Sequence, residues 1–404
     1  MLAALGFLRY LPALVFWLAL HVWVGRRMMR PLGWSRPRRI GSWLLIAAIA
    51  LYPMIALSLP RLSPEHPAER AVVFSGMLVF GFASIVLALT AGIAAVQTVL
   101  RPIQWLVARR RPAVTPEPEP DLERRNFFSN VMHAGVLTTA GTVTAAGVRG
   151  ALRLPDVKRV DVTIAGLDPR LEGLTIAHLS DIHIGPTIRS DYLRGLVDQV
   201  NELEVDLVAV TGDVVDGLVE HLSPQLAPLS DLRSTHGTFA VTGNHEYYWR
   251  GEQWVEFFDQ GLGMRVLGNR HEVLEHQGAR FTLAGVHDLH AARHVPAHAS
   301  DPQRAAEGAP DGLRILLAHQ PRSAPAAAET NAFDLQLSGH THGGQYAPFP
   351  IMVWLAQPYL AGLHRVSERM QIYVSRGCGY WGPPIRAGAP SEIAVLRLTG
   401  GSVA

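Results

Sequence analysis

The chain contains 404 residues, which is more than one average domain requires and enough for two. Its 36 basic and 34 acidic residues nearly cancel, and the formal net charge is +2. This balance excludes a strongly basic nucleic-acid-binding protein, so no specific nucleic acid is predicted as a partner, and it also excludes an acidic disordered chain. Cys378 is the only cysteine, which excludes an intramolecular disulfide framework and a cysteine-rich metal site.

Long apolar segments dominate the N-terminal part of the chain. A helix needs about 20 apolar residues to cross a bilayer, and four segments reach this length: residues 5–24, 41–60, 71–100 and 126–148. The fourth is the weakest, because Gly, Ala and Thr are frequent in it. The sequence therefore predicts a membrane domain of about three transmembrane helices over residues 1–110, a Pro-rich cytoplasmic linker over 111–125, and a fourth transmembrane or export-signal-like helix over 126–148.

The distribution of arginines predicts the orientation of these segments. Loops 25–40 and 101–125 are rich in arginine, whereas loop 61–70 has two arginines offset by two acids. Since arginine-rich loops stay cytoplasmic, we expect a multi-pass protein of the bacterial inner (cell) membrane whose later residues face the periplasm or the exterior. Arg124 and Arg125 also resemble a twin-arginine export motif, which would add the twin-arginine translocase as a partner. Alternatively, the two arginines only mark the cytoplasmic end of a helix.

Residues 155–404 have the pattern of a globular domain. Short β-rich runs alternate with helical stretches, and residues 189–203 carry their leucines and valines on one helical face. Strands separated by helices indicate an α/β sheet. Residues 291–312 are polar and rich in Pro and Ala, which predicts a surface loop. The expected strands are residues 174–179, 207–211, 238–242, 281–286, 313–318, 335–338, 371–375 and 392–398.

Polar side chains follow directly after five of the expected strands. Sites in open α/β sheets form at the carboxyl ends of strands, so five such turns would build one pocket. Carboxylate, imidazole and amide ligands suit Mn, Fe or Zn better than metals that prefer thiolates. Two such ions can clamp the attacking and leaving oxygens of a displacement at phosphorus. The clusters occupy residues 180–183, 211–216, 243–246, 318–320 and 338–344.

These motifs, in this order, resemble the signature of the calcineurin-like metallophosphoesterases: Asp-x-His, Gly-Asp-x-x-Asp, Gly-Asn-His-Glu, a single His, and Gly-His-x-His. The resemblance covers residues 174–398, and the sequence Gly-His-Thr-His-Gly-Gly-Gln from Gly339 is similar to the bacterial membrane-anchored or twin-arginine-exported branch. It implies an α/β fold in which N-terminal transmembrane helices precede a four-layer α/β/β/α sandwich. It also implies a metal-dependent phosphoric ester hydrolase.

The resemblance further implies a role for each matched residue. Asp213 would bridge two divalent metal ions, whose identity (Mn, Fe or Zn) stays open. His245 would lie near the leaving group as a general acid, or hold the phosphate, and Asp216 and Glu246 would orient imidazoles. The first ion would be bound by Asp181, His183 and His342, and the second by Asn244, His319 and His340.

Two features outside these motifs have more than one interpretation. Arg376 and Arg386 are candidate substrate contacts, because arginine binds phosphate through two N–H groups; the alternative is that they are solvated or structural. His287 stands where the resemblance predicts a small or acidic residue, and it begins a His-rich stretch that ends at His298. For this stretch a solvated loop is favoured over a further metal site.

The sequence thus predicts a membrane-anchored phosphoesterase with two metal ions, which hydrolyses a phosphate mono- or diester by metal-activated hydroxide. Its location suggests a phospholipid or another lipid- or envelope-linked phosphate as the substrate. Two alternatives stay open. One is a cytoplasmic-facing nucleotide-lipid pyrophosphatase similar to UDP-diacylglucosamine hydrolase, and the other is a non-catalytic membrane protein that senses phosphate.

Overall fold

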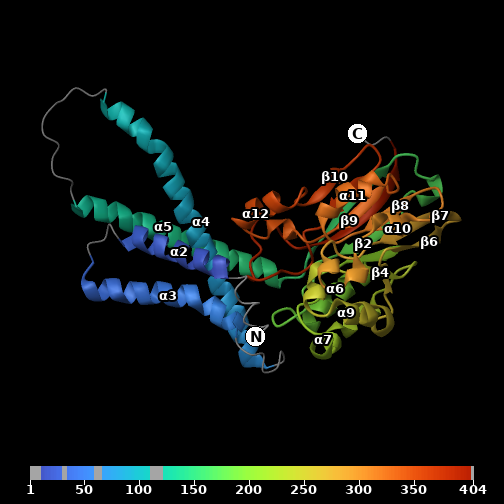
Figure 1. Cartoon of the computed structure of the whole chain (residues 1–404), viewed down its shortest axis with the longest axis horizontal. Coiled ribbons are helices and arrows are strands. Elements are labelled where there is room, and N and C mark those ends of the chain that lie inside the picture. The colour runs from blue at the N-terminus through green and yellow to red at the C-terminus, as the bar shows by residue number, and fades with distance from the viewer. Residues whose placement is uncertain (1–10, 30–33, 59–65, 110–121, 402–404) are drawn as a thin grey trace. The chain divides into compact units, whose positions relative to one another are not determined.

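The computed structural model describes residues 11–29, 34–58, 66–109 and 122–401. The chain divides into two compact units, Met1–Arg61 with Ala71–Ala146 and Leu62–Arg70 with Gly147–Ala404. The first unit is built from long helices and the second contains the β-sheets (Figure 1). The start of the first predicted span, residues 5–10, and most of the predicted Pro-rich linker, residues 111–121, lie outside the described residues.

Long helices account for the N-terminal part that the structure describes. They are α2 (Leu11–Met29), α3 (Arg36–Ser58), α4 (Pro67–Arg109) and α5 (Leu122–Leu152). Three helical segments in the described part are long and apolar enough to cross a membrane: residues 36–57, 67–107 and 126–152. They overlap the second, third and fourth predicted spans. The helix α5 continues without a break through Arg124 and Arg125.

Small residues allow α3 and α4 to approach each other closely. A Cβ atom at Gly76 of α4 would overlap the Cβ of Ala56 on α3. Beside this contact, the hydroxyls of Tyr52 and Ser75 lie 2.7 Å apart and share a hydrogen bond. Close packing at small residues and hydrogen bonds between helices are the interactions that hold helices together in lipid, where apolar surfaces gain little by association.

Two six-stranded mixed sheets form the second unit. The first has the strand order β1-β12-β2-β3-β4-β5, and the second has the order β10-β11-β9-β8-β7-β6. In the first sheet β2, β3, β4 and β5 are parallel neighbours, and in the second β11, β9, β8 and β7 are parallel neighbours. The strands are β1 (Asp156–Ile164), β2 (Thr175–Leu179), β3 (Leu207–Thr211), β4 (Thr238–Val241), β5 (Arg265–Val266), β6 (Arg270–His276), β7 (Ala279–Gly285), β8 (Arg314–Leu317), β9 (Leu335–Ser338), β10 (Gly362–Arg365), β11 (Gln371–Val374) and β12 (Glu392–Gly400).

Helices cover the outer face of each sheet. The α-helices are α6 (Ser190–Asn201), α7 (Val219–Leu226), α8 (Asn244–Tyr248), α9 (Gly251–Glu256), α10 (Pro302–Ala306), α11 (Ala324–Glu329) and α12 (Phe349–Ala356). The short helices are η2 (Pro169–Leu171), η3 (Ala227–Asp231), η4 (Phe257–Gly261), η5 (Ala291–Arg293), η6 (Pro296–His298), η7 (Pro321–Ser323) and η8 (His342–Gly344). Residues 291–312, predicted as a loop, therefore contain three short helices.

Three hydrophobic cores separate the layers. Side chains such as Ile176 and Phe239 of the first sheet meet Phe281 and Ile315 of the second in the central core. Successive strand residues point to opposite faces, so Ala177 packs on the other side, in the core beneath α6 and α7. A third core lies between the second sheet and α11. This arrangement confirms the predicted four-layer α/β/β/α sandwich.

Candidate metal centre

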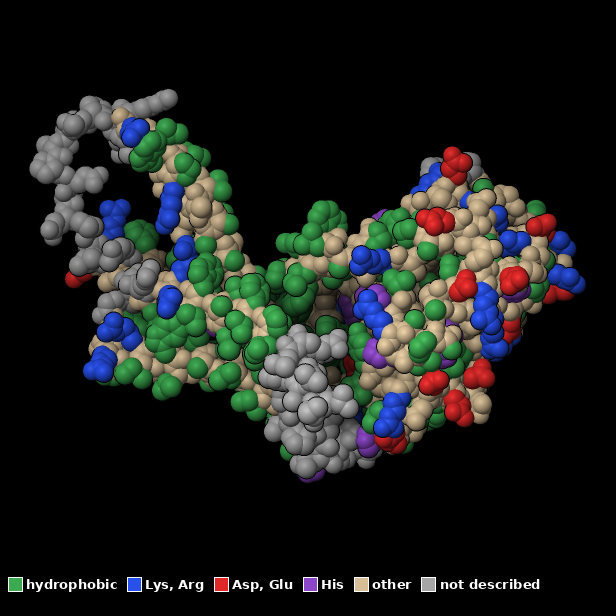
Figure 2. Space-filling model, in the orientation of Figure 1, with side chains coloured by type: hydrophobic (Ala, Val, Ile, Leu, Met, Phe, Trp, Pro, Cys, Tyr) green, Lys and Arg blue, Asp and Glu red, His purple; other side chains and the backbone are tan. Residues whose placement is uncertain are grey.

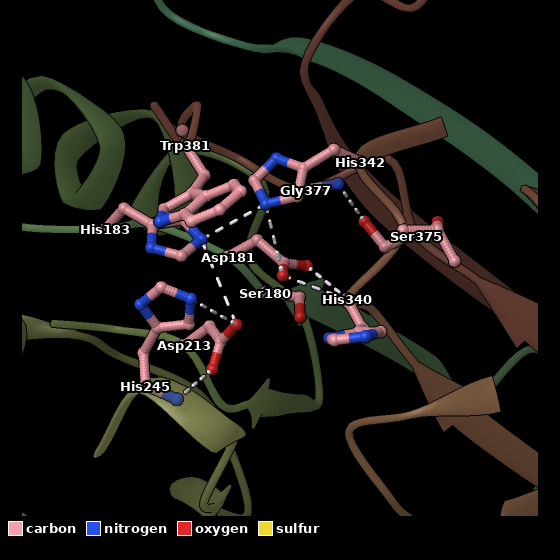
Figure 3. Close-up of polar contacts among 12 residues, drawn as sticks. Ser180, Asp181, His183, Asp213, His245, His340, His342, Ser375, Gly377 and Trp381 are labelled. Carbon is pink, nitrogen blue, oxygen red and sulfur yellow. Dashed lines mark hydrogen bonds and ion pairs between the residues drawn. The ribbon is translucent and has the colours of Figure 1, made fainter. Parts of the chain in front are cut away.

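The predicted ligands lie in loops at the carboxyl ends of strands from both sheets. Asp181 follows β2, and Asp213 follows β3. In the second sheet His319 follows β8, and the loop after β9 carries His340 and His342. Figure 3 shows Asp181, Asp213, His340 and His342 converging on one place, and the ligand atom of His319 lies within 4.8 Å of those of Asp213 and His340.

Asp181, His183 and His342 form one group of potential ligands. Their ligand atoms all lie within 4.8 Å of one another, and all three residues are buried. The Nε2 atoms of His183 and His342 are 3.1 Å apart, and Nε2 of His342 lies 3.5 Å from Oδ1 of Asp181. One carboxylate and two imidazoles at this spacing have the chemistry that binds borderline divalent metals.

Asp213, His319 and His340 form a second group. Oδ2 of Asp213 is 3.1 Å from Nε2 of His319, and that nitrogen is 3.2 Å from Nδ1 of His340. The same Oδ2 atom is 4.0 Å from Nε2 of His183, which belongs to the first group. The carboxylate of Asp213 therefore lies between the two groups.

Asn244 carries an orphaned polar atom. Its side-chain oxygen Oδ1 is buried and has no hydrogen-bond partner among the described residues. Buried polar atoms are almost always paired, and an unpaired one in a native fold calls for an unseen water or ion. An amide oxygen beside carboxylates and imidazoles is a suitable ligand for a divalent cation. The donor set and this orphaned oxygen therefore fit a pair of metal ions.

The carboxylate of Asp216 lies between two imidazoles. Its Oδ2 accepts a hydrogen bond from Nδ1 of His183 at 3.0 Å, and its Oδ1 accepts one from Nδ1 of His245. Both rings then present Nε2 toward Asp213, at 4.0 and 3.9 Å. A hydrogen bond of this kind fixes the tautomer and the orientation of a metal-binding imidazole.

Glu246 acts on the backbone rather than on an imidazole. Its carboxylate accepts hydrogen bonds from the N–H groups of Asp213 at 3.0 Å and Val214 at 2.8 Å, and from the N–H of Gly243 at 2.6 Å. Burial and the charge of Asp213 raise the pKa of Glu246 to about 7. This residue therefore joins the loop after β3 to the loop after β4. The resemblance implied that Glu246 orients an imidazole, but these hydrogen bonds of its carboxylate are to backbone amides.

The backbone of the site is strained. Five predicted ligands have positive φ: Asp181 (53°), His183 (56°), Asp213 (53°), His340 (70°) and His342 (52°). Such conformations are uncommon for residues other than glycine, and each costs of order 1–3 kcal/mol unless the surrounding structure enforces it. Strain of this kind concentrates at functional sites. Its accumulation in these loops marks them as a site and not as ordinary strand connections.

Glycine is required at two motif positions because side-chain atoms of the site approach the backbone closely there. A Cβ atom at Gly339 would overlap Oγ of Ser180 and Oδ2 of Asp181, and one at Gly243 would overlap Oδ1 of Asp213. Any side chain at either position would displace a predicted ligand. Glycine is the residue that permits such approach of the backbone.

The ionisation of the site follows from buried carboxylates lying beside buried imidazoles. Burial lowers the pKa of His319, but the charge of Asp213, its hydrogen bond and the charges of Asp181 and Asp288 together raise this pKa to about 10. Burial also lowers the pKa of His245, but Asp213 and Asp216 together raise this pKa to about 9. Burial would raise the pKa of Asp213, but His319 and His245 hold it well below its usual range. Burial lowers the pKa of His340 to about 3. A permanently ionised carboxylate thus lies at the centre of the cluster.

The two candidate substrate arginines occupy different environments. Arg386 is 4% exposed, and its guanidinium donates to the carbonyl oxygens of Gly379, Arg376, Ala389 and His342. Because its donors point at protein acceptors, the structure favours the structural alternative for Arg386, in which this arginine holds the loop of His342. Arg376 is half-buried, and its side chain packs beside Gly343 in that loop.

The two histidines at the ends of the His-rich stretch pack against each other, whereas His294 between them is exposed. His287 is 9% exposed, and its ring stacks on His298 with centroids 4.0 Å apart and 7° between the planes. The hydroxyl of Tyr247 lies 3.0 Å from Nδ1 of His287 and 2.8 Å from Nδ1 of His298. Two imidazoles and a tyrosine hydroxyl therefore form a packed polar cluster. This cluster is buried by contacts between residues that are distant in the sequence, and no local sequence pattern predicts such contacts.

Two aromatic side chains border the cluster of ligands. The ring of Trp381 lies 5.6 Å from that of His245, and the ring of Tyr248 lies 5.1 Å from it. Both remain exposed, at 54% and 56%. Figure 3 shows Trp381 on the same side of the site as His183. Sequence analysis did not select Trp381, because this residue lies outside every motif.

Known proteins are similar to this chain. The model of the calcineurin-like phosphoesterase family matches residues 174–344. A Helicobacter pylori protein called an uncharacterized metallophosphoesterase is 41% identical over 276 residues, which cover 68% of this chain and 72% of that protein. A Danio rerio protein called a transmembrane protein with metallophosphoesterase domain is 38% identical over 269 residues, covering 65% of this chain and 61% of that one. The crystal structure of a dimetal phosphatase from Danio rerio aligns with 51% of this chain and 88% of that chain, with 14% identity and a TM-score of 0.31.

Proposed function

Since the chain belongs to the calcineurin-like metallophosphoesterase family, we propose that the cluster around Asp213 is its catalytic site and binds two divalent metal ions. The observation that carries this proposal is the convergence of two ligand groups on one carboxylate. The orphaned Oδ1 atom of Asn244 supports it, because that oxygen lacks any partner from the described chain.

Each ligand has a proposed place in this centre. Asp213 contributes to both ions. Asp181, His183 and His342 hold the first, and Asn244, His319 and His340 hold the second. When bound, such ions (Mn, Fe or Zn) supply Lewis-acid stabilisation of a phosphoryl group and a water molecule of lowered pKa. Glu246 keeps the loops of Asp213 and Asn244 together through its three backbone hydrogen bonds.

His245 is the proposed proton donor to the leaving oxygen. Its Nδ1–H is directed to Asp216, and its backbone N–H donates to Oδ1 of Asp213 at 2.9 Å. These two bonds fix the ring so that Nε2 faces the side of the cluster where a phosphate ester would bind. A positioned imidazole contributes typically 10²–10⁴-fold to such a proton transfer. Arg376, on the neighbouring loop, is the proposed contact for the phosphate.

The membrane helices support a substrate at the bilayer. The candidate span 126–152 ends within the second unit, where the carbonyl of Gly147 accepts the backbone N–H of Arg386 at 2.9 Å. We therefore propose a phosphate mono- or diester carried by a membrane lipid, with the catalytic unit (residues 155–404) on the periplasmic or external face. A reporter fused after Ala404 tests this orientation. Cytoplasmic reporter activity would favour the nucleotide-lipid pyrophosphatase instead.

The experiment uses the full chain purified in detergent, stripped of metal and reloaded with Mn²⁺. Hydrolysis of bis-p-nitrophenyl phosphate and p-nitrophenyl phosphate is measured together with the metal content of the protein. We expect two metal ions per chain and Mn²⁺-dependent turnover, and we expect Asp213→Asn to abolish turnover. Two bound metals without hydrolysis of either ester or of a lipid phosphate would contradict the proposal and favour the phosphate sensor.

Asn244 offers a matched test of the second ion. We expect Asn244→Ala to bind one metal ion and lose most of its activity, because it deletes a single ligand oxygen. Asn201, whose Nδ2 donates to the carbonyl of Asp231 on the surface, provides the control: Asn201→Ala should keep both ions. Equal metal content in the two variants would show that Asn244 is not a ligand.

A further inference from the structure

The helix α12 (Phe349–Ala356) is apolar on every side and has no buried residue. Its sequence, FPIMVWLA, contains no charged or polar side chain. Ile351 is 65% exposed, Trp354 68% and Leu355 74%. In a water-soluble protein a helix that is hydrophobic all round is buried, and contiguous apolar surface left open marks a protein or membrane contact. Figure 2 shows hydrophobic side chains standing out from the second unit where Figure 1 labels α12.

This helix is continuous with the border of the metal centre. It follows η8, which contains His342, and a Cβ at Gly344 would lie 2.5 Å from Cα of Pro350. Between the two helices, the side chain of Gln345 accepts the N–H of Trp381 at 3.0 Å and donates to the carbonyl of Trp381 at 3.1 Å. Thus α12 and Trp381, whose ring lies 5.6 Å from His245, are attached to the same short segment.

The chain that leaves the membrane-spanning helix reaches the same loops. A Cβ at Gly150, in the last turns of α5, would lie 2.7 Å from the carbonyl oxygen of Arg386. Arg386 in turn donates to the carbonyl oxygen of His342 at 3.0 Å. One residue therefore separates the C-terminal end of a candidate span from a proposed metal ligand.

We propose that α12 inserts into the surface of the bilayer that the chain's own helices cross, and that it holds the mouth of the metal centre against the lipid head groups. Helices that lie at the membrane surface bury their apolar residues, such as Trp, Phe and Leu, roughly 5–10 Å into the boundary between head groups and acyl chains, and Trp favours this boundary. Exposed Arg322 lies at the end of α12, where its backbone N–H donates to Oε1 of Gln357 at 3.0 Å. A cation at this place suits anionic head groups.

The consequence for substrate rests on the proposed function. A lipid phosphoester would enter beside α12 from the plane of the membrane, with its phosphate passing Trp381 and Tyr248 to reach His245. The insertion itself is independent of catalysis, so the test follows the position of the helix and not turnover.

The experiment places a nitroxide spin label on Leu355→Cys in the full chain, reconstituted in nanodiscs that contain anionic lipid. Collision with oxygen, which concentrates in lipid, is compared with collision with an aqueous nickel chelate. Val273→Cys on β6, also apolar and 43% exposed, is the matched control. The native Cys378 is buried, and burial raises the pKa of its thiol to about 12, so it stays unlabelled. We expect an oxygen-to-nickel ratio several-fold higher at position 355 than at 273.

Other occupants give different results, and each would overturn the proposal. A label at 355 that collides with nickel as freely as the label at 273 lies in water. A label that collides with neither reagent is covered by protein, either the helices of this chain or a second copy, and a short label-to-label distance would identify the copy. A second label at Met352→Cys should give the same oxygen-to-nickel ratio as the label at 355. Thermal unfolding of both labelled proteins shows whether either substitution disturbs the fold. If the label shows that α12 is inserted but the protein has no turnover, the proposed catalytic function is refuted and the insertion of α12 is not.

Discussion

The guanidinium of Arg386 donates to the carbonyl oxygen of His342 at 3.0 Å, and another of its nitrogens lies 3.0 Å from Nδ1 of the same residue. Arg386 is buried, and its own backbone N–H bonds to the carbonyl of Gly147 at the end of α5. It therefore joins the end of a candidate membrane span to a predicted metal ligand. Since His342 has positive φ, its backbone needs an external support, and this arginine supplies one.

Replacing Arg386 should weaken the metal centre without touching a ligand. We expect Arg386→Gln to lower Mn²⁺ affinity or kcat/KM by about 10–100-fold, the usual effect of removing a residue that orients a ligand. Titration of the metal-free protein with Mn²⁺ measures the affinity. Arg376→Gln is the contrasting variant: it should raise KM for the phosphate ester and leave Mn²⁺ affinity unchanged. If both variants altered only KM, Arg386 would be a substrate contact after all.

Asp216 should be sensitive to a change of one atom. Both of its oxygens accept from imidazole N–H groups, those of His183 and His245, whereas the amide of asparagine has only one oxygen to accept with. We expect Asp216→Asn to reduce kcat/KM by about 10–100-fold through misoriented imidazoles, with a folded protein by circular dichroism. Glu220→Gln, an exposed acid on the nearby α7, should leave activity unchanged. Equal rates for both variants would refute the orienting role.

The strands that sequence reasoning missed share one property. The eight predicted strands correspond to β2, β3, β4, β7, β8, β9, β11 and β12, and the four missed ones, β1, β5, β6 and β10, are the edge strands of the two sheets. Edge strands carry charges that discourage pairing with other chains, such as Arg159 and Asp161 on β1 and Glu272 on β6. Their sequences therefore lack the apolar pattern by which buried strands are detected.

The candidate site was predictable where it depends on local motifs. Each ligand lies directly after a buried strand, and the motif glycines are those that a close approach requires. The role of Arg386, the burial of His287 and the exposure of α12 depend on partners far away in the sequence. An apolar octapeptide such as FPIMVWLA has the same composition whether it is buried or exposed to solvent, so only the tertiary structure reveals its exposure.

His287 should make the protein less stable in acid. Burial, with a contribution from His298, lowers the pKa of His287 from 6.5 to about 4. The unfolded chain therefore binds a proton at higher pH than the folded chain does, and stability falls as pH drops from about 6.5 to about 4, by at most about 1.4 kcal/mol per pH unit. His287→Gln removes this effect. We expect the Tm of the variant, relative to the wild type, to rise steadily between pH 7 and pH 4.5.

The control for this pH effect is His221→Gln, at an exposed position on α7. Because this side chain is exposed, its replacement should change Tm little at either pH. A His287→Gln difference equally insensitive to pH would mean that His287 binds its proton equally in the folded and unfolded chains, and would contradict the prediction.

The contact between Gly76 and Ala56 should control the packing of α3 against α4. A methyl group at Gly76 would overlap the Cβ of Ala56, and overpacking of a close contact typically costs about 1–3 kcal/mol. We expect Gly76→Ala to lower the Tm of the full chain in detergent. Gly92→Ala on the same helix should have little effect, because a Cβ there meets no atom within 4 Å. The double variant Gly76→Ala with Ala56→Gly moves the methyl group to the other helix and should recover most of the lost stability. Without such recovery, the loss would come from the helix itself and not from the contact.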